Sequence, residues 1–235
     1  MIRSENIRSS AWVAFTTGVL PILVVNGCYI VSVVGNHIPK CIPYLQGCTS
    51  ISSAGRYGAA FFLFKSGMIP LALLLAYFWI LVRRWLIALG DRQNRELQAL
   101  VYIGLLGAAF LILYTVFLGT KGDIYSLLRR FGVTVYFSCS YLAQLLLLHR
   151  LVTLRDAGKI QLPRSITGGM LTIAIVLLFL GLISIPIGNF LFIDEKKTAM
   201  NIIEWNFALL LSGYYLLAWR AWLRVDPVQN VTDGT

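Results

Sequence analysis

Hydrophobic side chains occur along this chain in long runs that are separated by short polar segments. Six of the runs are long enough to cross the apolar core of a bilayer, which takes about 20 residues of helix. The runs cover residues 11–35, 57–82, 98–119, 131–153, 166–190 and 200–223. The pattern predicts an all-α polytopic membrane protein, in which residues 1–235 form one bundle of six transmembrane helices.

The composition supports this prediction. Hydrophobic residues make up 58% of the chain and charged residues only 13%, about half the charged share of a typical soluble domain. A soluble core built from 235 residues cannot bury so many apolar side chains. The net charge of +10 would suggest a nucleic-acid partner in a soluble protein. Here the basic residues lie at the ends of apolar runs, where they set orientation and contact lipid headgroups, so we expect no nucleic acid.

The distribution of lysine and arginine predicts that both termini are cytoplasmic, because cytoplasmic loops carry the excess of these residues. The side with the termini holds twelve: Arg3, Arg8, Arg83, Arg84, Arg92, Arg95, Arg150, Arg155, Lys159, Arg164, Arg220 and Arg224. The opposite side holds seven: Lys40, Arg56, Lys121, Arg129, Arg130, Lys196 and Lys197. Loops one, three and five are therefore predicted to be non-cytoplasmic, in the plasma membrane or an endomembrane.

The loop between the first two runs, called loop one, contains the longest polar stretch in the first half of the chain, "CIPYLQGCTSISSAGR", residues 41–56. Its two cysteines, Cys41 and Cys48, lie on the side predicted to be oxidising, where a disulfide can form. Closing so short a loop stabilises it by about 2–3 kcal/mol in the chain-entropy model. Two free thiols remain the alternative.

Two ionisable residues, Lys65 and Glu204, fall inside predicted spans, where an unpaired charge costs about 2.5–3.5 kcal/mol. A rise of 1.5 Å per residue places them about 12 Å and 6 Å below the same surface. That depth permits an ion pair or a shared polar cavity. Alternatively, Lys65 extends to the surface, and Glu204 lies in the interfacial belt beside Trp205. Arg129 and Arg130 are rival partners for Glu204.

Common catalytic signatures are absent from the sequence. It contains no HExxH, no phosphate-binding loop and no GxSxG, which are marks of metalloproteases, nucleotide-binding proteins and α/β-hydrolases. We expect no cofactor and no metal, and we assign no catalytic residue. An acyl-transfer enzyme would need a base beside a hydroxyl nucleophile, and His37 is the only histidine on the side of loop one.

Three segments in a fixed order resemble a known family. They are "GNHIPKCIPYLQGCTSISSAGRYGAAFFLFKSG", "RRFGVTVYFSCSYLAQLLLL" and "IIEWNFALLLSGYYLLAW". Together they are similar to the FRAG/DRAM/SFK family of six-span membrane proteins, which includes the GPI-anchor lipid-remodelling factor and the damage-regulated autophagy modulators. The segment "PYLQGCTSISSAGR" lacks the aspartate and the Pro-Glu of the autophagy branch. Its Ser50-Ile51-Ser52 turn resembles the GPI-lipid branch more closely.

The resemblance implies a protein that binds lipid, or assists lipid or GPI-type lipid remodelling, through an outward-facing polar cleft. Membrane lipids, and other membrane proteins, are the expected partners. The alternatives are a non-catalytic scaffold or regulator, a small-solute transporter that uses Lys65 and Glu204, and a membrane enzyme. The predicted ligand-binding residues are Ser50, Ser52, Ser53, Arg56, Lys65, Arg130, Glu204 and Trp205.

The predicted orientation can be tested at the sequon Asn230-Val231-Thr232. A cytoplasmic tail is never exposed to the glycosylation machinery, so we expect Asn230 to carry no glycan when the protein is made in a eukaryotic cell. The measurement is the electrophoretic mobility before and after glycosidase treatment. A mobility shift that Asn230→Gln abolishes would reverse the orientation.

Overall fold

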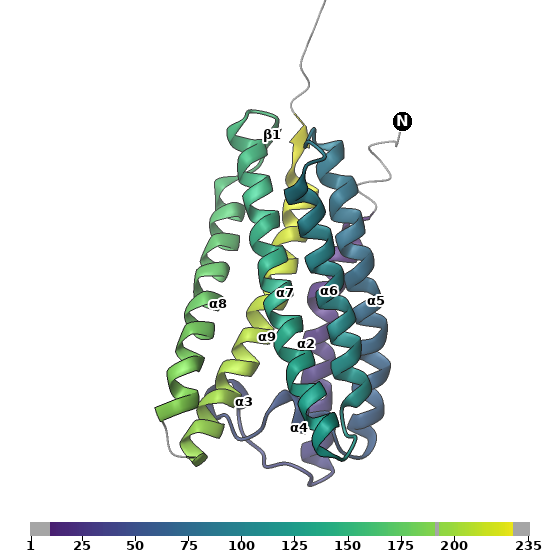
Figure 1. The fold of residues 1–235 in the computed structure, drawn as a ribbon, viewed down its shortest axis with the longest axis vertical. Coiled ribbons are helices and arrows are strands. Elements are labelled where there is room, and N and C mark those ends of the chain that lie inside the picture. The colour runs from purple at the N-terminus through teal and green to yellow at the C-terminus, as the bar shows by residue number, and fades with distance from the viewer. Residues whose placement is uncertain (1–9, 191–192, 228–235) are drawn as a thin grey trace, which may run out of the picture.

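The computed structural model describes residues 10–190 and 193–227. Six long helices dominate it (Figure 1). Each contains an apolar stretch long enough to cross a bilayer, so the predicted all-α, six-span fold is confirmed. The six helices are α2 (Ala11–Val34), α5 (Gly58–Ala88), α6 (Arg95–Phe117), α7 (Asp123–Asp156), α8 (Arg164–Phe190) and α9 (Ile193–Arg224).

Short elements mark the two ends of the bundle. Loop one contains α3 (Pro43–Gln46) and α4 (Ile51–Ala54), which lie together at the lower end in Figure 1. We call this the loop-one end. At the opposite end, β1 (Ile160–Gln161) pairs in antiparallel register with β2 (Asp226–Pro227), and we call it the strand end. Helix α2 begins and α9 ends there, as six crossings require.

Three helices extend well beyond the predicted spans, and α9 is one of them, since it begins at Ile193 rather than at residue 200. Helix α5 continues from residue 82 to Ala88, because Arg83 and Arg84 favour helix and Trp85 and Leu86 beyond them are buried in the core. Helix α7 begins at Asp123 rather than at residue 131, and an acidic residue in a first turn complements the helix dipole. Arg129 and Arg130 therefore lie within α7 rather than in front of it.

The helices do not pack evenly. Helix α2 packs against α5 and α9, and α6 packs against α5 and α7. Helix α8 packs on α9 but only lightly on α7, and α7 contacts α9 at few points. Only 17% of the apolar stretch of α8 is buried, against 33–39% in the other five helices. Helix α8 is therefore the peripheral member of the bundle (Figure 1).

Polar side chains connect α7 to α9 where these helices do meet. The Gln144 side chain donates from Nε2 to the Leu211 carbonyl at 3.0 Å. The Tyr214 hydroxyl donates to the Gln144 carbonyl at 2.5 Å. Both bonds are buried, and such interhelical bonds stabilise membrane bundles by about 0.6 kcal/mol each. These two bonds fix α7 and α9 against one another in the interior of the bundle, farther from loop one than the beginning of α7.

Arg150, on α7, joins this helix to α6 and to the α5–α6 connection at the strand end. Its guanidinium donates to both carboxylate oxygens of Asp91, in the α5–α6 connection, with Nε 2.9 Å from Oδ2. It also donates from Nη1 to Glu96 Oε2, on α6, at 2.7 Å. Arg150 is 7% exposed and Asp91 8%. A bidentate pair of this kind fixes geometry as well as charge, so it holds α7 against the α5–α6 connection.

A second set of bonds at the strand end ties α8 to its neighbours. Arg155 Nη1, near the end of α7, donates to Thr167 Oγ1 in the first turn of α8 at 2.8 Å. The β1–β2 pair fastens the α7–α8 connection to the residues after α9. Helix α8 is thus held from two sides at this end.

Replacing Asp91 by alanine should destabilise the protein, because it leaves the buried Arg150 with one partner in place of two. Removing one member of a buried pair costs about 3–5 kcal/mol. The measurement is the free energy of unfolding in mixed micelles. The matched control is Asp156→Ala, which removes a carboxylate from an exposed pair with Arg155 and should cost less than about 1 kcal/mol. Equal losses in the two variants would contradict the structural role of Arg150.

Candidate functional site

Loop one is bound to the beginning of α9 by side-chain hydrogen bonds. Three α9 side chains donate to loop-one carbonyls: Asn201 Nδ2 to Gly47 (2.8 Å), Trp205 Nε1 to Thr49 (2.9 Å) and Asn206 Nδ2 to Tyr44 (2.8 Å). An unsatisfied carbonyl at the membrane boundary is costly, and these bonds satisfy three of them. The segment around α3 and α4 is therefore fixed as a cover over the bundle.

Glu204 supplies the acceptor in the same contact. Its carboxylate accepts the backbone N–H groups of Ile51 and Ser52, at the start of α4. The Ser50 hydroxyl caps the same turn by accepting from the Ser53 N–H at 3.1 Å. The first N–H groups of a helix have no partner within it, and here a carboxylate and a hydroxyl provide one. Glu204 can therefore lie inside a span because its carboxylate accepts hydrogen bonds from the backbone of α4.

Loop one is also held by α2 and by its own cysteines. The Tyr29 hydroxyl donates to the Cys41 carbonyl at 2.6 Å and accepts from the Cys41 N–H at 2.8 Å. The Ser32 hydroxyl donates to the Ala54 carbonyl at 2.7 Å. Cys41 and Cys48 form a disulfide, as the sequence predicted. These contacts brace both ends of the loop.

Tyr44 and Gly47 show how closely the loop fits. The Tyr44 hydroxyl accepts from Asn26 Nδ2 at 2.9 Å, and burial raises the pKa of Tyr44, with a smaller opposing effect of this bond. Gly47 has a φ of 58°, and a Cβ there would lie 2.1 Å from the Thr198 carbonyl oxygen. Only glycine fits both the left-handed backbone and the close approach to α9.

Lys65 does not pair with Glu204, contrary to one of the expectations from the sequence. Its ammonium donates to the Val116 carbonyl at 3.0 Å and lies 4.3 Å from the centroid of the Phe61 ring. Val116 is in the last turn of α6, where carbonyls have no partner within the helix. Lys65 therefore satisfies a helix end, and it lies on the face of α5 that meets α6.

A groove opens between α7, α8 and α9 in the half of the bundle nearest loop one. We call it the lateral groove; its volume is about 760 Å³. Several residues that line it, including Leu182 and Ile185, are also exposed on the surface, so the groove opens sideways, toward the bilayer. Its polar wall includes Ser52, Tyr114, Arg129, Arg130, Ser138 and Glu204, and its apolar wall includes Val133, Phe137, Leu142, Leu177, Leu178, Leu182, Ile185 and Phe207.

The arginines of the lateral groove lie at one end of it. Arg129 and Arg130 lie near the beginning of α7, and Ser52 lies in loop one, so these groups mark the mouth at the loop-one end. The α7 residues that line the groove extend to Leu142, about 18 Å farther along the helix at 1.5 Å per residue. One leaflet contributes about half of a 30 Å hydrocarbon core. The groove therefore has the length of one leaflet.

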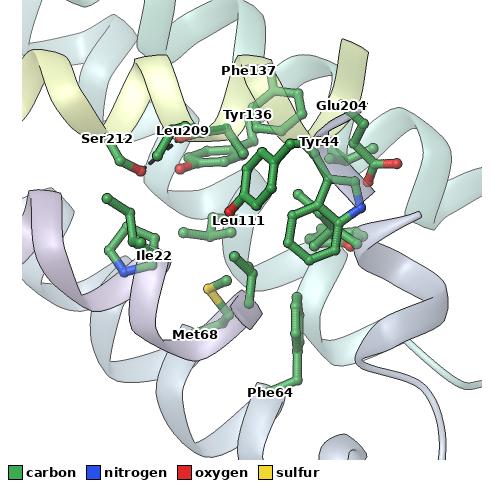
Figure 2. Close-up of a pocket in the computed structure, with 17 residues that line it drawn as sticks. Ile22, Tyr44, Phe64, Met68, Leu111, Tyr136, Phe137, Glu204, Leu209 and Ser212 are labelled. Atoms are coloured by element: carbon green, nitrogen blue, oxygen red, sulfur yellow. Dashed lines mark hydrogen bonds between the residues drawn. The ribbon is translucent and has the colours of Figure 1, made fainter. Parts of the chain in front are cut away.

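A second, smaller cavity, which we call the central cavity, lies among α2, α5, α6, α7 and α9 and shares Tyr114 and Glu204 with the lateral groove. Figure 2 shows Glu204 at one end of it and Ser212 at the other, with Phe64 and Met68 contributed by α5. Its volume is about 40 Å³, enough for a few water molecules at most. The cavity is too small for a lipid chain, and the lateral groove is the candidate site.

The donors at the mouth of the groove suit an anion rather than a cation. Arginine and tyrosine offer N–H and O–H groups, whereas metal sites need carboxylate, imidazole or thiolate ligands. Within residues 10–190 and 193–227, no three His, Cys, Asp or Glu side chains gather as a metal site requires.

Comparison with known proteins adds no assignment: no protein-family model, curated protein or solved structure matches this chain.

The structure brings together part of the predicted site. Ser52, Arg130 and Glu204 line the lateral groove, and Arg56 contacts Ser52. The other four lie elsewhere: Ser50 caps α4, Ser53 lies within α4, Trp205 borders the central cavity, and Lys65 faces α6. The prediction missed Tyr114 and the α8 wall, for which the sequence offers no local signal, and it named Arg129 only as a partner for Glu204.

Replacing Glu204 by alanine should loosen α4, because the N–H groups of Ile51 and Ser52 lose their acceptor. Leaving buried donors unsatisfied costs about 1–3 kcal/mol, so we expect amide hydrogen exchange in residues 51–54 to accelerate about tenfold or more. Glu204→Gln keeps one acceptor oxygen and should give a smaller effect. The control Glu195→Ala alters an exposed carboxylate on the same helix. Unchanged exchange in α4 would show that the carboxylate does not hold it.

Proposed function

We propose that this protein binds a membrane lipid in the lateral groove, with the headgroup at the loop-one end and an acyl chain between α7 and α8. The observation that carries the proposal is the groove itself, which has arginines at its mouth and an apolar wall one leaflet long. Ligand sites are typically concave and mostly apolar, with a few polar groups that fix orientation. A lipid has the same division of polar and apolar parts.

The positions of the basic residues support a direction for this binding. The excess of lysine and arginine at the strand end favours a cytoplasmic position for that end. The mouth of the groove then faces the non-cytoplasmic leaflet. A lipid in that leaflet can enter sideways, because the groove is open between α7 and α8.

The resemblance to the FRAG/DRAM/SFK family supports a role for this binding in lipid or GPI-type lipid remodelling. In that role the protein holds a lipid with its headgroup beside loop one, where a partner enzyme can reach it. We assign no catalytic residue to the chain itself. A transport pathway through Lys65 and Glu204 is not proposed, because these two side chains face different helices.

Filling the groove should abolish lipid binding. Gly181 lines the groove on α8, and a Cβ added there meets no atom within 4 Å, so Gly181→Trp directs an indole ring into the space of the groove. We expect the amount of lipid retained by the purified protein to fall at least tenfold. The measurement is native mass spectrometry after exchange into a detergent that contains a defined lipid.

Gly168→Trp is the matched control for this substitution. Gly168 is on the same helix, also has open space around its Cβ, and does not line the groove. Both substitutions remove a helical glycine, so their effects on helix propensity are equal. The control should retain lipid like the wild type. A wild-type protein without bound lipid, or equal retention by the two variants, would contradict the proposed function.

A further inference from the structure

Three arginines from two segments gather at the mouth of the lateral groove. Arg129 and Arg130 come from α7, and the charges of Arg56 and Arg130 both act on that of Arg129. Arg56 Nη2 donates to the Ser52 hydroxyl, which lines the groove, at 3.4 Å. The ion pairs within residues 10–190 and 193–227 include none of the three. Like charges held close together repel, and a bound anion would relieve that repulsion.

The Tyr114 hydroxyl is a second and independent mark of a ligand. Tyr114 lies in the wall shared by the groove and the central cavity and is 4% exposed, yet its hydroxyl has no hydrogen-bond partner in the described part of the chain. The buried Nε of Arg56 also has none there. Arg129 and Arg56 act electrostatically on Tyr114. Buried donors are nearly always satisfied in folded proteins, so a missing acceptor at this place calls for an explanation.

We propose that the groove selects lipids that carry a phosphate group, which Arg56, Arg129, Arg130, Ser52 and the Tyr114 hydroxyl bind at the mouth. This assignment rests on the proposed function, since it names the class of lipid that the groove takes. Phosphate offers several acceptor oxygens and a full negative charge, and it matches the planar fork of arginine. A neutral headgroup would leave the three guanidinium charges uncompensated.

Glu204 does not oppose this arrangement directly. Its carboxylate also lies in the wall of the groove and acts on Tyr114, but its oxygens are engaged by the N–H groups of Ile51 and Ser52. The same contact positions α4, which carries Ser52 toward α7. Glu204 is thus a positioning residue for the anion site.

The first test compares lipids with identical acyl chains and different headgroups. Dissociation constants for phosphatidic acid, phosphatidylinositol and diacylglycerol are measured by native mass spectrometry on the full chain. We expect both phosphate-bearing lipids to bind at least tenfold more tightly than diacylglycerol. Arg129→Gln and Arg130→Gln should each reduce that preference several-fold. The control Lys121→Gln removes one positive charge from the same end, outside the groove, and should not change it.

Tyr114→Phe separates a ligand contact from a structural role. The substitution removes only a hydroxyl that has no partner among residues 10–190 and 193–227, so the lipid-free protein should melt at the same temperature or higher. Its affinity for phosphatidic acid should fall about tenfold, as expected for a lost hydrogen bond to a charged group. Its affinity for diacylglycerol should not change. Unchanged binding of phosphatidic acid would remove Tyr114 from the site.

The possible failures are distinguishable. If diacylglycerol binds as tightly as phosphatidic acid, the phosphate assignment is wrong while lipid binding in the groove stands. If no lipid binds, both proposals are wrong. Inorganic phosphate at millimolar concentration should not displace phosphatidic acid. If it does so in the wild type and not in Arg129→Gln, the site binds a free anion and its assignment to a lipid is overturned.

Discussion

The contact between loop one and the beginning of α9 is the interaction on which the loop-one end of the protein depends. A carboxylate inside a membrane-spanning helix and two free N–H groups at the start of α4 would each be unfavourable alone. Glu204 resolves both at once by accepting from Ile51 and Ser52. Amide and indole donors of the same helix satisfy the carbonyls around them. The position of loop one then fixes where Ser52 and Arg56 meet α7.

The number of membrane-spanning helices could be predicted from the sequence, because it depends on the length and composition of the apolar runs. The cost of exposing polar backbone to lipid forces helices of a certain length, so the apolar runs alone were enough to give six spans. The disulfide between Cys41 and Cys48 was predicted because both cysteines lie in loop one, on the side expected to be oxidising. Helix ends were predicted less well: Asp123 and Arg84 both continue helices that the apolar runs leave out.

The side-chain partners inside the bundle could not be predicted, because hydropathy gives depth but not the face of a helix. Lys65 and Glu204 were placed at compatible depths, yet Lys65 bonds to the Val116 carbonyl and Glu204 to loop one. The acceptor at Val116 is a backbone group, which no sequence pattern distinguishes from its neighbours. The lateral groove is harder still to predict, since Tyr114, Arg129 and Gly181 come from three different helices.

The unequal fastening of α8 has a mechanical consequence. At the strand end, the β1–β2 pair and the bond between Arg155 and Thr167 tie this helix to both neighbours. Near the mouth of the lateral groove, α8 packs mainly on α9, and the side of α8 that faces α7 lines the open groove. Since α9 begins at Ile193, soon after α8 ends at Phe190, α8 stays beside α9 at the other end, and a separation from α7 would have its pivot near Thr167. The gap between α7 and α8 would be widest at the mouth of the lateral groove, where the proposed lipid headgroup would enter, while the contact near the strand end stays closed.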